Sequence, residues 1–365
     1  MGLKSASASG ARREGRAARA AGVLLAAIML EGGIAVADQE SLKVLHSAVA
    51  IRDVCAWPNL TLLPSSDVVA TIFNQPSHGG LPGDVDCWAS SDGGRTWEKR
   101  GMAAARPGPD FNRMNVAAGL AADGDLVVVA SGYRDPGRFR DFFPALVCRS
   151  SDGARTWQAT SELPEAPTGQ VYIPYGDIVA GGDGALRMAC YAAGGETRRT
   201  YLLRSGDDGR TWGEPVVIGE GINETALLHL GGGAWIAAAR THGDGRLLLW
   251  RSDDDGATWR DAGPLSEAGQ HPAHLQRLAD GRVLLTYGDR RPGEQGVRVL
   301  FGSEDGEEWG GALRIVDLSA TGGDLGYPSS VQLADGTILT AYYASTSAGY
   351  AGYQMGVVVW ELLGG

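Results

Sequence analysis

Residues 90–97 read SSDGGRTW, and close copies of this octapeptide recur along the chain. The copies are SSDGARTW at 150–157, SGDDGRTW at 205–212, SDDDGATW at 252–259 and the more divergent GSEDGEEW at 302–309. Their tryptophans lie about 50 residues apart, and a period of this size is typical of repeat architectures. The Asp and Ser side chains can bond to backbone N–H groups within a turn, so each octapeptide is expected to close a hairpin.

A second repeat is interleaved with the first and consists of two apolar strands joined by a short turn. Asp-Gly and Gly-Gly turns between such runs are strong hairpin signals, because the tight hairpin turns need residues with positive φ. The six copies are LLPSSDVVATI (62–72), LAADGDLVVVAS (120–131), VAGGDGALRMACY (179–191), LHLGGGAWIAAAR (228–240), LQRLADGRVLLTYG (275–288) and VQLADGTILTAYY (331–343). Each unit of about 50 residues therefore holds two hairpins, or four strands, which is typical of a propeller blade.

The two ends of the chain indicate how the ring closes. The sixth unit lacks the octapeptide and ends with an apolar strand near 355–363, while a lone strand at 42–50 precedes the first unit. We expect the N-terminal strand to complete blade six, because this pairing removes two free strand edges. The sequence thus predicts an all-β fold, a six-bladed β-propeller of four-stranded antiparallel blades over residues 42–363, with few helices.

Composition narrows the class of function. The formal net charge is −11, which argues against nucleic-acid binding because that needs a basic footprint. No segment after the N-terminal region is apolar and long enough for a membrane helix. Neither a zinc-type Cys/His spacing nor a nucleotide-binding glycine motif occurs, so we expect no metal and no cofactor.

The N-terminal region has the layout of a secretory signal peptide. Basic residues precede an apolar run at 20–30, and Ala35-Val36-Ala37 follows as a small-residue cleavage site. We expect residues 1–37 to be removed and the protein to be secreted or periplasmic; a misassigned start codon is the alternative. An exported chain can form disulfides. The four cysteines allow three pairings, and buried free thiols remain equally open.

Polar residues gather where the predicted innermost strands begin and where the second strands end. Segments entering the innermost strands carry Arg52-Asp53, residues 112–115, Tyr172, Tyr175, Asn223-Glu224, His271 and Tyr327. Segments leaving the second strands carry residues 73–78, Tyr133-Arg134, 240–242, 289–291 and Tyr343. The turns at the opposite end are plain Asp-Gly, Gly-Gly and Ser-Asp sequences. This asymmetry predicts a pocket at one end of the central channel.

The repeated S-x-D-x-G-x-T-W octapeptide in a six-bladed propeller resembles the sialidase (neuraminidase) superfamily, whose repeats are called Asp-boxes or BNR repeats. The resemblance covers roughly residues 42–363. It implies a retaining exo-glycosidase whose substrate is a glycan ending in sialic acid or a related acidic sugar, and we expect it to act as a monomer. Such enzymes use an arginine cluster for the carboxylate, a tyrosine nucleophile paired with a glutamate, and a third acid.

Three catalytic positions are similar to the family pattern. Tyr327 in GYPSSVQLADG resembles the nucleophile, although Pro328 stands where Ser is usual. Glu224 in NETALLHL resembles its glutamate partner, and Arg240 follows at the end of the next strand as the second family arginine does. The third arginine is expected at Arg298, with Arg290 and Arg291 as competitors.

The first blade departs from the family pattern. The family's Arg-Ile-Pro segment is replaced by Ala56-Trp57-Pro58, and Arg52 is a candidate to fill the same space. His78 stands where the family's proton donor lies, with Asp84 as the alternative, since histidine can act as a general acid near neutral pH.

Two further residues, His271 and Arg113, are candidates for substrate binding. Two other functions stay open. One is a related enzyme, a lyase or a glycosidase that uses His78 and His271 for proton transfer. The other is a non-catalytic glycan-binding propeller.

Overall fold

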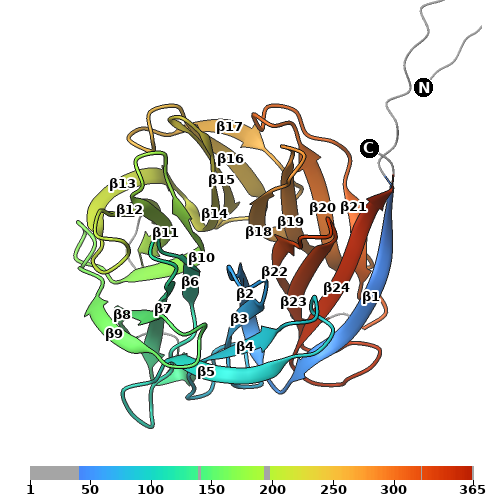
Figure 1. The fold of residues 1–365 in the computed structure, drawn as a ribbon, viewed down its shortest axis with the longest axis horizontal. Helices are drawn as coiled ribbons and strands as arrows, with labels where there is room; N and C mark the ends of the chain where they lie inside the picture. The colour runs from blue at the N-terminus through green and yellow to red at the C-terminus, as the bar shows by residue number, and fades with distance from the viewer. Residues whose placement is uncertain (1–40, 139–140, 193–197, 322, 364–365) are drawn as a thin grey trace, which may run out of the picture. The chain divides into compact units, whose positions relative to one another are not determined.

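The structure is a computed structural model that describes residues 41–138, 141–192, 198–321 and 323–363. These residues form antiparallel four-stranded sheets that stand as blades around a central axis (Figure 1). Within these ranges the single helical element is the 3-10 helix η1 (Pro136–Arg138). The expected all-β propeller of six blades is thereby confirmed.

In blades 1 to 5 the strands run outwards from the axis in chain order, and in blade 6 the first strand of the chain is outermost. Blades 1 to 3 consist of β2 (Cys55–Leu62), β3 (Val68–Phe73), β4 (Val85–Ser90) and β5 (Glu98–Ala104); β6 (Val116–Leu120), β7 (Leu126–Arg134), β8 (Asp141–Ser150) and β9 (Gln158–Glu162); and β10 (Tyr172–Ala180), β11 (Leu186–Ala192), β12 (Arg199–Ser205) and β13 (Gly213–Glu220). Blades 4 and 5 consist of β14 (Ile222–Gly231), β15 (Ala234–Thr241), β16 (Leu247–Ser252) and β17 (Arg260–Pro264); and β18 (Gln270–Arg277), β19 (Val283–Asp289), β20 (Gly296–Gly302) and β21 (Leu313–Asp317). Blade 6 consists of β22 (Leu325–Gln332), β23 (Ile338–Ala344), β24 (Gln354–Leu363) and β1 (Ser41–Arg52).

Blade 6 closes the ring with strands from both ends of the described chain. β1 pairs antiparallel with β24, from Ser41 opposite Leu363 to Arg52 opposite Gln354, and forms the outer strand at the right of Figure 1. The closure expected from the sequence is confirmed. Its physical effect is to cover the edge that β24 would otherwise expose.

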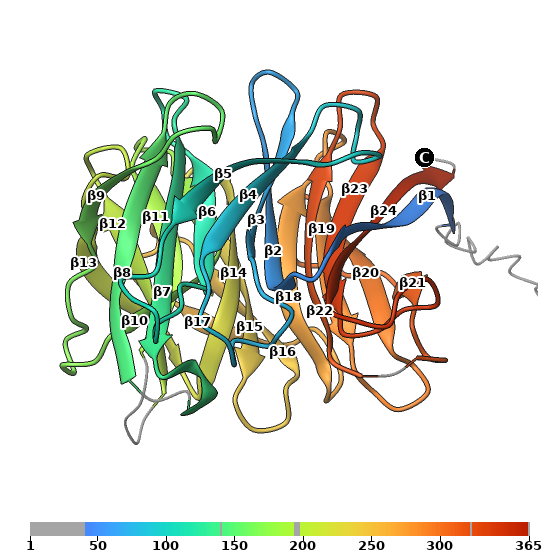
Figure 2. The ribbon, with the colours of Figure 1, turned by 90° about the horizontal axis from the view of Figure 1, so that it is seen from below.

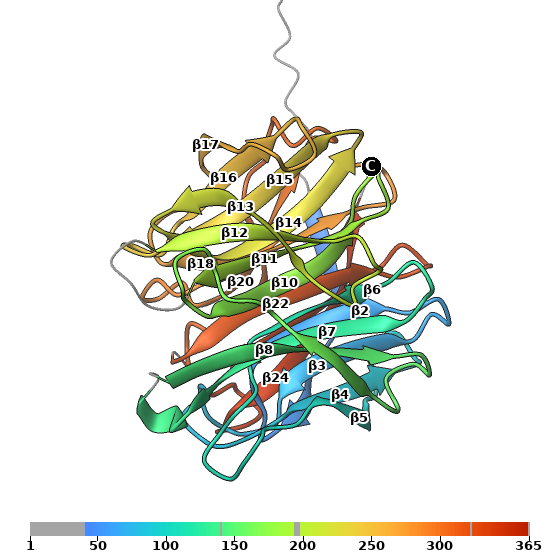
Figure 3. The same ribbon diagram turned by 90° about the vertical axis from the view of Figure 1, so that its left-hand side faces the viewer.

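Two neighbouring blades are joined through their innermost strands. β6 and β10 pair in parallel at Gly176 opposite Ala117 and Asp177 opposite Ala118, so blades 2 and 3 form one eight-stranded sheet. Figure 3 views the molecule from the side of these two blades. Gly119, also on β6, lies against the carbonyl of Ile178, where an added Cβ would come within 2.3 Å of that oxygen. The close approach of the two strands therefore requires glycine at this position.

Apolar side chains fill each junction between adjacent blades. Successive side chains of a strand point to opposite faces of the sheet. Val127 and Val129 of β7 therefore pack toward blade 3, whereas Val128 and Ala130 pack toward blade 1. Equivalent clusters fill the other four junctions. A middle strand buried on both faces reads as a continuous apolar run, which is why the second repeat of the sequence is so apolar.

The octapeptides close the outer hairpins by hydrogen bonds within each turn. In the first copy, Asp92 Oδ1 accepts the N–H groups of Arg95 and Thr96 at 3.0 and 2.9 Å, and Thr96 Oγ1 donates to Asp92 Oδ2 at 2.6 Å. The indole N–H of Trp97 donates to the carbonyl of Gly94 at 3.0 Å. The Thr-to-Asp bond recurs at 2.6 Å in the next three copies. These boxes are therefore turn-forming units.

The four cysteines are buried free thiols at Cys55, Cys87, Cys148 and Cys190. Burial raises the pKa of Cys87 and Cys190 well above the ordinary value, which favours the inert thiol form.

The expected signal peptide lies outside the described residues. None of the described helical residues forms a segment capable of crossing a bilayer.

The connections between strands lie at the two opposite ends of the axis. The β2–β3 turn lies at the upper edge of Figure 2, and the β15–β16 connection lies at the lower edge. The innermost strands begin at this lower end, which we call the site end.

Candidate active site

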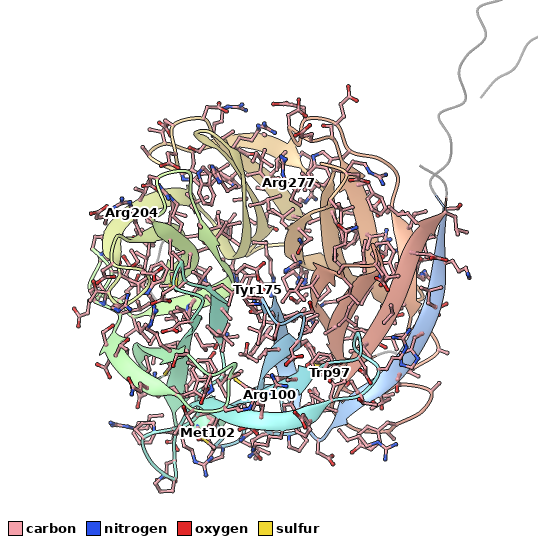
Figure 4. The ribbon with its side chains drawn as sticks, viewed as in Figure 1. Trp97, Arg100, Met102, Tyr175, Arg204 and Arg277 are labelled. Atoms are coloured by element: carbon pink, nitrogen blue, oxygen red, sulfur yellow. The ribbon has the colours of Figure 1, made fainter. Side chains whose placement is uncertain are left out.

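A buried aromatic cluster occupies the site end of the axis. It brings together side chains from four blades: Trp57, Tyr133, Tyr175, Tyr327 and Tyr343. Tyr175 lies close to the central axis in Figure 4, whereas Met102 and Arg204 lie at the rim. The Tyr175 hydroxyl donates to the carbonyl of Ala273 at 2.9 Å, which ties blade 3 to blade 5.

Within this cluster, Tyr327 forms a hydrogen-bonded chain with a glutamate and an arginine. The Tyr327 hydroxyl donates to Glu224 Oε1, and Arg240 Nη1 donates to Glu224 Oε2 at 2.6 Å. Pairing of Thr225 with Ala239 in the β14–β15 hairpin sets Glu224 and Arg240 side by side. The Glu224 side chain is only 6% exposed, and its ion pair with Arg240 compensates the charge in this largely dry site.

The environment keeps the Tyr327 phenol neutral at rest. Burial raises the pKa of Tyr327 well above its ordinary value, and the adjacent Glu224 carboxylate raises it further. The charges of Arg240 and Arg290 act in the opposite direction but are outweighed. A neutral phenol bonded to a carboxylate can lose its proton as its oxygen attacks, because the base is already in contact.

The backbone is strained on both sides of this site. Tyr327 has φ of 48°, Ala56 has φ of 32° and Trp57 has φ of 53°, all in the left-handed region that non-glycine residues rarely adopt. Pairing is irregular at the same places, between Gly326 and Ser329 and between Cys55 and Asn59. Such bulges re-aim side chains next to active sites, and the strain costs about 1–3 kcal/mol per residue.

A second polar cluster centres on Asp324, three residues before Tyr327. Asp324 Oδ2 contacts His78 Nδ1 at 2.6 Å and accepts the Tyr353 hydroxyl at 3.2 Å. Asp324 Oδ1 accepts the Tyr343 hydroxyl at 2.5 Å and Arg290 Nη1 at 3.2 Å. Burial alone would raise the pKa of Asp324, but the bond and charge of His78 and the other donors hold it well below its ordinary value.

The two clusters meet over the ring of Tyr327. The guanidinium of Arg290 lies 5.6 Å from the centroid of that ring, and the His78 ring lies edge-on to it at 6.5 Å. Trp57 packs edge-on against the Tyr327 ring at 5.1 Å and against the His78 ring at 5.2 Å. The His78 side chain is 38% exposed, so a ligand or water can reach it.

The site carries balanced charges. Glu224 faces Arg240, and Asp324 faces Arg290 and His78. His271, at the start of β18, is buried, and its pKa is lowered to about 3 by burial first and then by the charges of Arg240 and Arg290. His271 is therefore neutral near pH 7, and a protonated His271 does not fit this environment.

Two candidates from the sequence are bound to other partners. Asp84 accepts the Arg106 N–H at 2.7 Å and Arg106 Nη1 at 2.8 Å, so its carboxylate organises the loop between blades 1 and 2. Arg298 on β20 donates to Asp289 Oδ2 at 2.7 Å and also contacts Glu294. Arg290, rather than Arg298, is the arginine that lies over Tyr327, because the ion pairs of Arg298 fix it two strands outwards from the axis.

Two other arginines also lie apart from the Tyr327–Glu224 pair. Arg52, on the outermost strand of blade 6, places its guanidinium over the ring of Tyr350 at 5.1 Å. Arg113 donates to the carbonyls of Ala130 and Pro144 at 2.9 and 2.7 Å, and burial lowers its pKa to about 10. Both arginines are therefore held by partners outside the Tyr327–Glu224 pair.

Sequence reasoning did not single out Asp324 or Trp57. Asp324 lies in a glycine-rich approach to β22, TGGDLGY, and nothing in that spacing distinguishes it from a turn aspartate. The detectable signal was its position on a segment entering an innermost strand, as for Tyr327. In the described ranges no group of three His, Cys, Asp or Glu side chains is placed to hold a metal ion.

Comparison with solved structures gives the same fold class. A protein of unknown function from Dyadobacter fermentans is 23% identical with a TM-score of 0.75, covering 88% of this chain and 99% of that one. A mutant NanB sialidase from Streptococcus pneumoniae is 14% identical with a TM-score of 0.67, covering 86% and 68%. A mutant Trypanosoma rangeli sialidase displaying trans-sialidase activity is 16% identical with a TM-score of 0.65, covering 85% of this chain but only 54% of that one.

The fold is thus the sialidase-like propeller. The family model for the BNR repeat-like domain matches residues 69–339, and the chain belongs to this family. Among curated protein sequences none matches.

Proposed function

We propose that this protein is a retaining exo-glycosidase that removes a terminal acidic sugar, sialic acid or a close relative, from glycans. The observation that carries the proposal is the buried Tyr327–Glu224–Arg240 chain with Arg290 over the same ring. A phenol held against a carboxylate is an activated nucleophile. Guanidinium groups next to it suit the carboxylate of an acidic sugar.

The reaction would proceed in two displacement steps. Glu224 accepts the phenolic proton while Tyr327 Oη attacks the anomeric carbon, and the bond to the leaving oxygen breaks. His78 donates a proton to that oxygen, with its Nδ1 held by Asp324. His78 then deprotonates water, which attacks the anomeric carbon; Tyr327 departs and recovers its proton from Glu224.

Release of methylumbelliferone from its α-sialoside by residues 38–365 tests the proposal. The variant Tyr327→Phe removes only the hydroxyl, and the expected loss of turnover is roughly 10⁴-fold. Tyr350→Phe is the matched control, since its hydroxyl also donates to a carboxylate, that of Asp53 at 2.5 Å, but lies outside the cluster. Equal turnover by wild type and Tyr327→Phe would refute Tyr327 as nucleophile.

Stereochemistry offers an independent check of the two-step route. Proton magnetic resonance of the first product formed distinguishes retention from inversion, and the proposal requires the α-anomer to appear first. Inversion would exclude the covalent route through Tyr327.

One observation favours a different acidic sugar as substrate. Ala56 supplies no arginine, and Asp324 neutralises part of the charge of Arg290, so the site holds less net positive charge than a three-arginine cluster. If the α-sialoside is not turned over, a panel of uronides and other keto-acid glycosides is the next assay. Loss of their turnover in Tyr327→Phe would keep the mechanism and change the substrate.

We further propose that the protein acts outside the cytoplasm as a monomer. The basis is the signal-like sequence of residues 1–37 and the closure of blade 6 by β1, which covers the edge of β24. Cell fractionation with mass determination of the mature protein tests the first point, and sedimentation tests the second.

A further inference from the structure

A well of about 370 Å³ opens at the end of the axis opposite to the site end, where the innermost strands finish. All six blades contribute to its lining, which includes the last residues of five innermost strands: Leu62, Leu120, Ala180, Arg277 and Gln332. Small-molecule sites in proteins are typically about 300–1,000 Å³ with mostly apolar walls and a few polar groups. The well is therefore large enough for a small organic molecule.

The walls of the well are mainly apolar and carry two charged side chains. Most of the lining residues are leucine, isoleucine, valine or alanine, and the two charged ones are Asp177 of β10 and Arg277 of β18. Arg277 Nη1 pairs with Glu304 Oε1 at 3.3 Å, and its Nη2 donates to the carbonyls of Leu230 and Glu304 at 3.2 and 2.9 Å. The charge of Arg277 is thus compensated within blade 5, and Asp177 is the charge that remains for a ligand.

Neutral groups from two other blades hold the Asp177 carboxylate. Asn59 Nδ2 donates to Oδ1 at 3.0 Å, and His274 Nε2 lies 3.1 Å from Oδ2. Because His274 Nδ1 accepts the N–H of Ser330 at 3.3 Å, the ring proton lies on Nε2 and the ring is neutral. In the described part of the chain, this ring is the one basic group within ion-pair distance of Asp177. The negative charge of the carboxylate therefore has no cation beside it.

The Asp177 carboxylate lies at the base of the well and is reached from it. Asp177 is the first of the four consecutive β10 residues in the lining, which end at the mouth with Ala180. Its side chain is 27% exposed, whereas the side chain of His274 is 5% exposed and Asn59 is buried. Asn59 and His274 instead line a cavity of about 20 Å³ together with Tyr327, and that cavity and the well have different lining residues. The layer of Asn59, Asp177 and His274 thus lies between the well and the candidate active site.

A single carboxylate at the base of an apolar well suits an organic cation. An ammonium group forms charge-assisted hydrogen bonds to a carboxylate, and an apolar body attached to it gains free energy by leaving water for the walls. A calcium or magnesium ion would need several more oxygen ligands, and the described residues offer no trio of His, Cys, Asp or Glu side chains for a metal. An acidic sugar would be repelled by Asp177.

We propose that this well binds a small organic amine, with the ammonium group on Asp177 and the apolar body against the leucine-rich walls. It is a second site, at the opposite end of the axis from Tyr327 and Glu224. The inference goes beyond the proposed function and does not depend on it, because no residue of the Tyr327 cluster lines the well.

The direct test compares benzylammonium with benzyl alcohol, a neutral molecule of nearly the same shape. Calorimetry and saturation-transfer resonance should show that the wild type binds benzylammonium about tenfold more tightly than benzyl alcohol, because a hydrogen bond to a charged group is added. Asp177→Asn should remove this preference. Asp324→Asn, the same change in a carboxylate at the site end, should keep it, and Tyr327→Phe should bind benzylammonium as the wild type does.

A second variant decides the test if Asp177→Asn does not fold. Leu62→Trp enlarges a half-buried side chain in the lining without removing a partner of Asp177, and it should weaken binding of benzylammonium about tenfold. Leu363→Trp, the same change at an exposed position of β24, should leave binding unchanged. The proposal is refuted if benzylammonium does not bind, binds no more tightly than benzyl alcohol, or binds Leu62→Trp as it binds the wild type. Loss of binding in Asp324→Asn but not in Asp177→Asn would place the amine at the site end and also refute it.

Discussion

Substitution of Asp324 by Asn should disrupt the cluster above Tyr327 while preserving its shape. Each carboxylate oxygen accepts from two partners: Oδ1 from Tyr343 and Arg290, and Oδ2 from His78 and Tyr353. An amide keeps only one accepting oxygen, so either orientation of Asn loses two of these contacts. The isosteric variant thus removes the charge and half of the bonds.

The magnitude follows from the contacts. Losing the bond to His78 costs about 1.5–3 kcal/mol because a charged group is involved, and losing a neutral hydroxyl partner costs about 1 kcal/mol. The side chains of Asp324 and His78 are 27% and 38% exposed, so solvent screening reduces the sum to about 2 kcal/mol. Because the pKa of Asp324 is held well below its ordinary value, this stability is present above the unfolded-state value of about 4 and is lost only in stronger acid.

Urea unfolding of the wild type, Asp324→Asn, His78→Ala and the double variant measures this contribution. We expect Asp324→Asn to lose about 2 kcal/mol, with a coupling of about 1 kcal/mol to His78 in the double-mutant cycle. Turnover of the α-sialoside should fall about 100-fold, because His78 is no longer oriented. A loss below about 0.5 kcal/mol with unchanged turnover would refute the role given to Asp324.

Three further predictions concern the surroundings of the site. Arg290→Ala should raise KM at least tenfold, because it removes a cation over Tyr327. Arg298→Ala should instead lower the unfolding free energy by about 1–3 kcal/mol, since it leaves the fully buried Asp289 with fewer partners. Steady-state kinetics and urea unfolding would show the reverse pattern for the two variants if the assignment were mistaken. Asp152→Asn should destabilise the protein at pH 7 but not at pH 2. The reason is that the bond from Thr156 lowers the pKa of Asp152 to about 2, so the stability that the carboxylate contributes disappears as pH falls from about 4 through that value. A difference in unfolding free energy between wild type and variant that persists in acid contradicts this. The four buried cysteines should be unreactive to a thiol reagent in the native protein and fully reactive after unfolding, and fewer than four thiols in the unfolded protein would contradict the free state.

Tyr327 and its partners show how far the sequence reaches into the candidate site. Tyr327, Glu224 and Arg240 each lie where a strand of a recognisable repeat begins or ends, so their positions in the blades follow from local pattern. Choosing between Arg290 and Arg298 needed the three-dimensional structure. Both lie near the β19–β20 hairpin, and only the ion pairs of Arg298 with Asp289 and Glu294 show that it is bound elsewhere.

The propeller itself was determined by the sequence. The octapeptides and the glycine turns are local signals, because each turn is stabilised by bonds between residues at most five positions apart, as between Asp92 and Thr96. Their number and spacing fix the blades, and the apolar runs between them fix which strands are buried. The closure by β1 followed from the need to cover a free edge.

The contacts that define chemistry were decided by the tertiary structure. Asp324 and His78 are separated by 246 positions, and Glu224 and Tyr327 by 103, yet each pair is in hydrogen-bond contact. No local pattern records such a distance, because it depends on how six blades are rotated about a common axis. The left-handed backbone at Trp57 and Tyr327 is likewise imposed by packing and not by the preference of either residue.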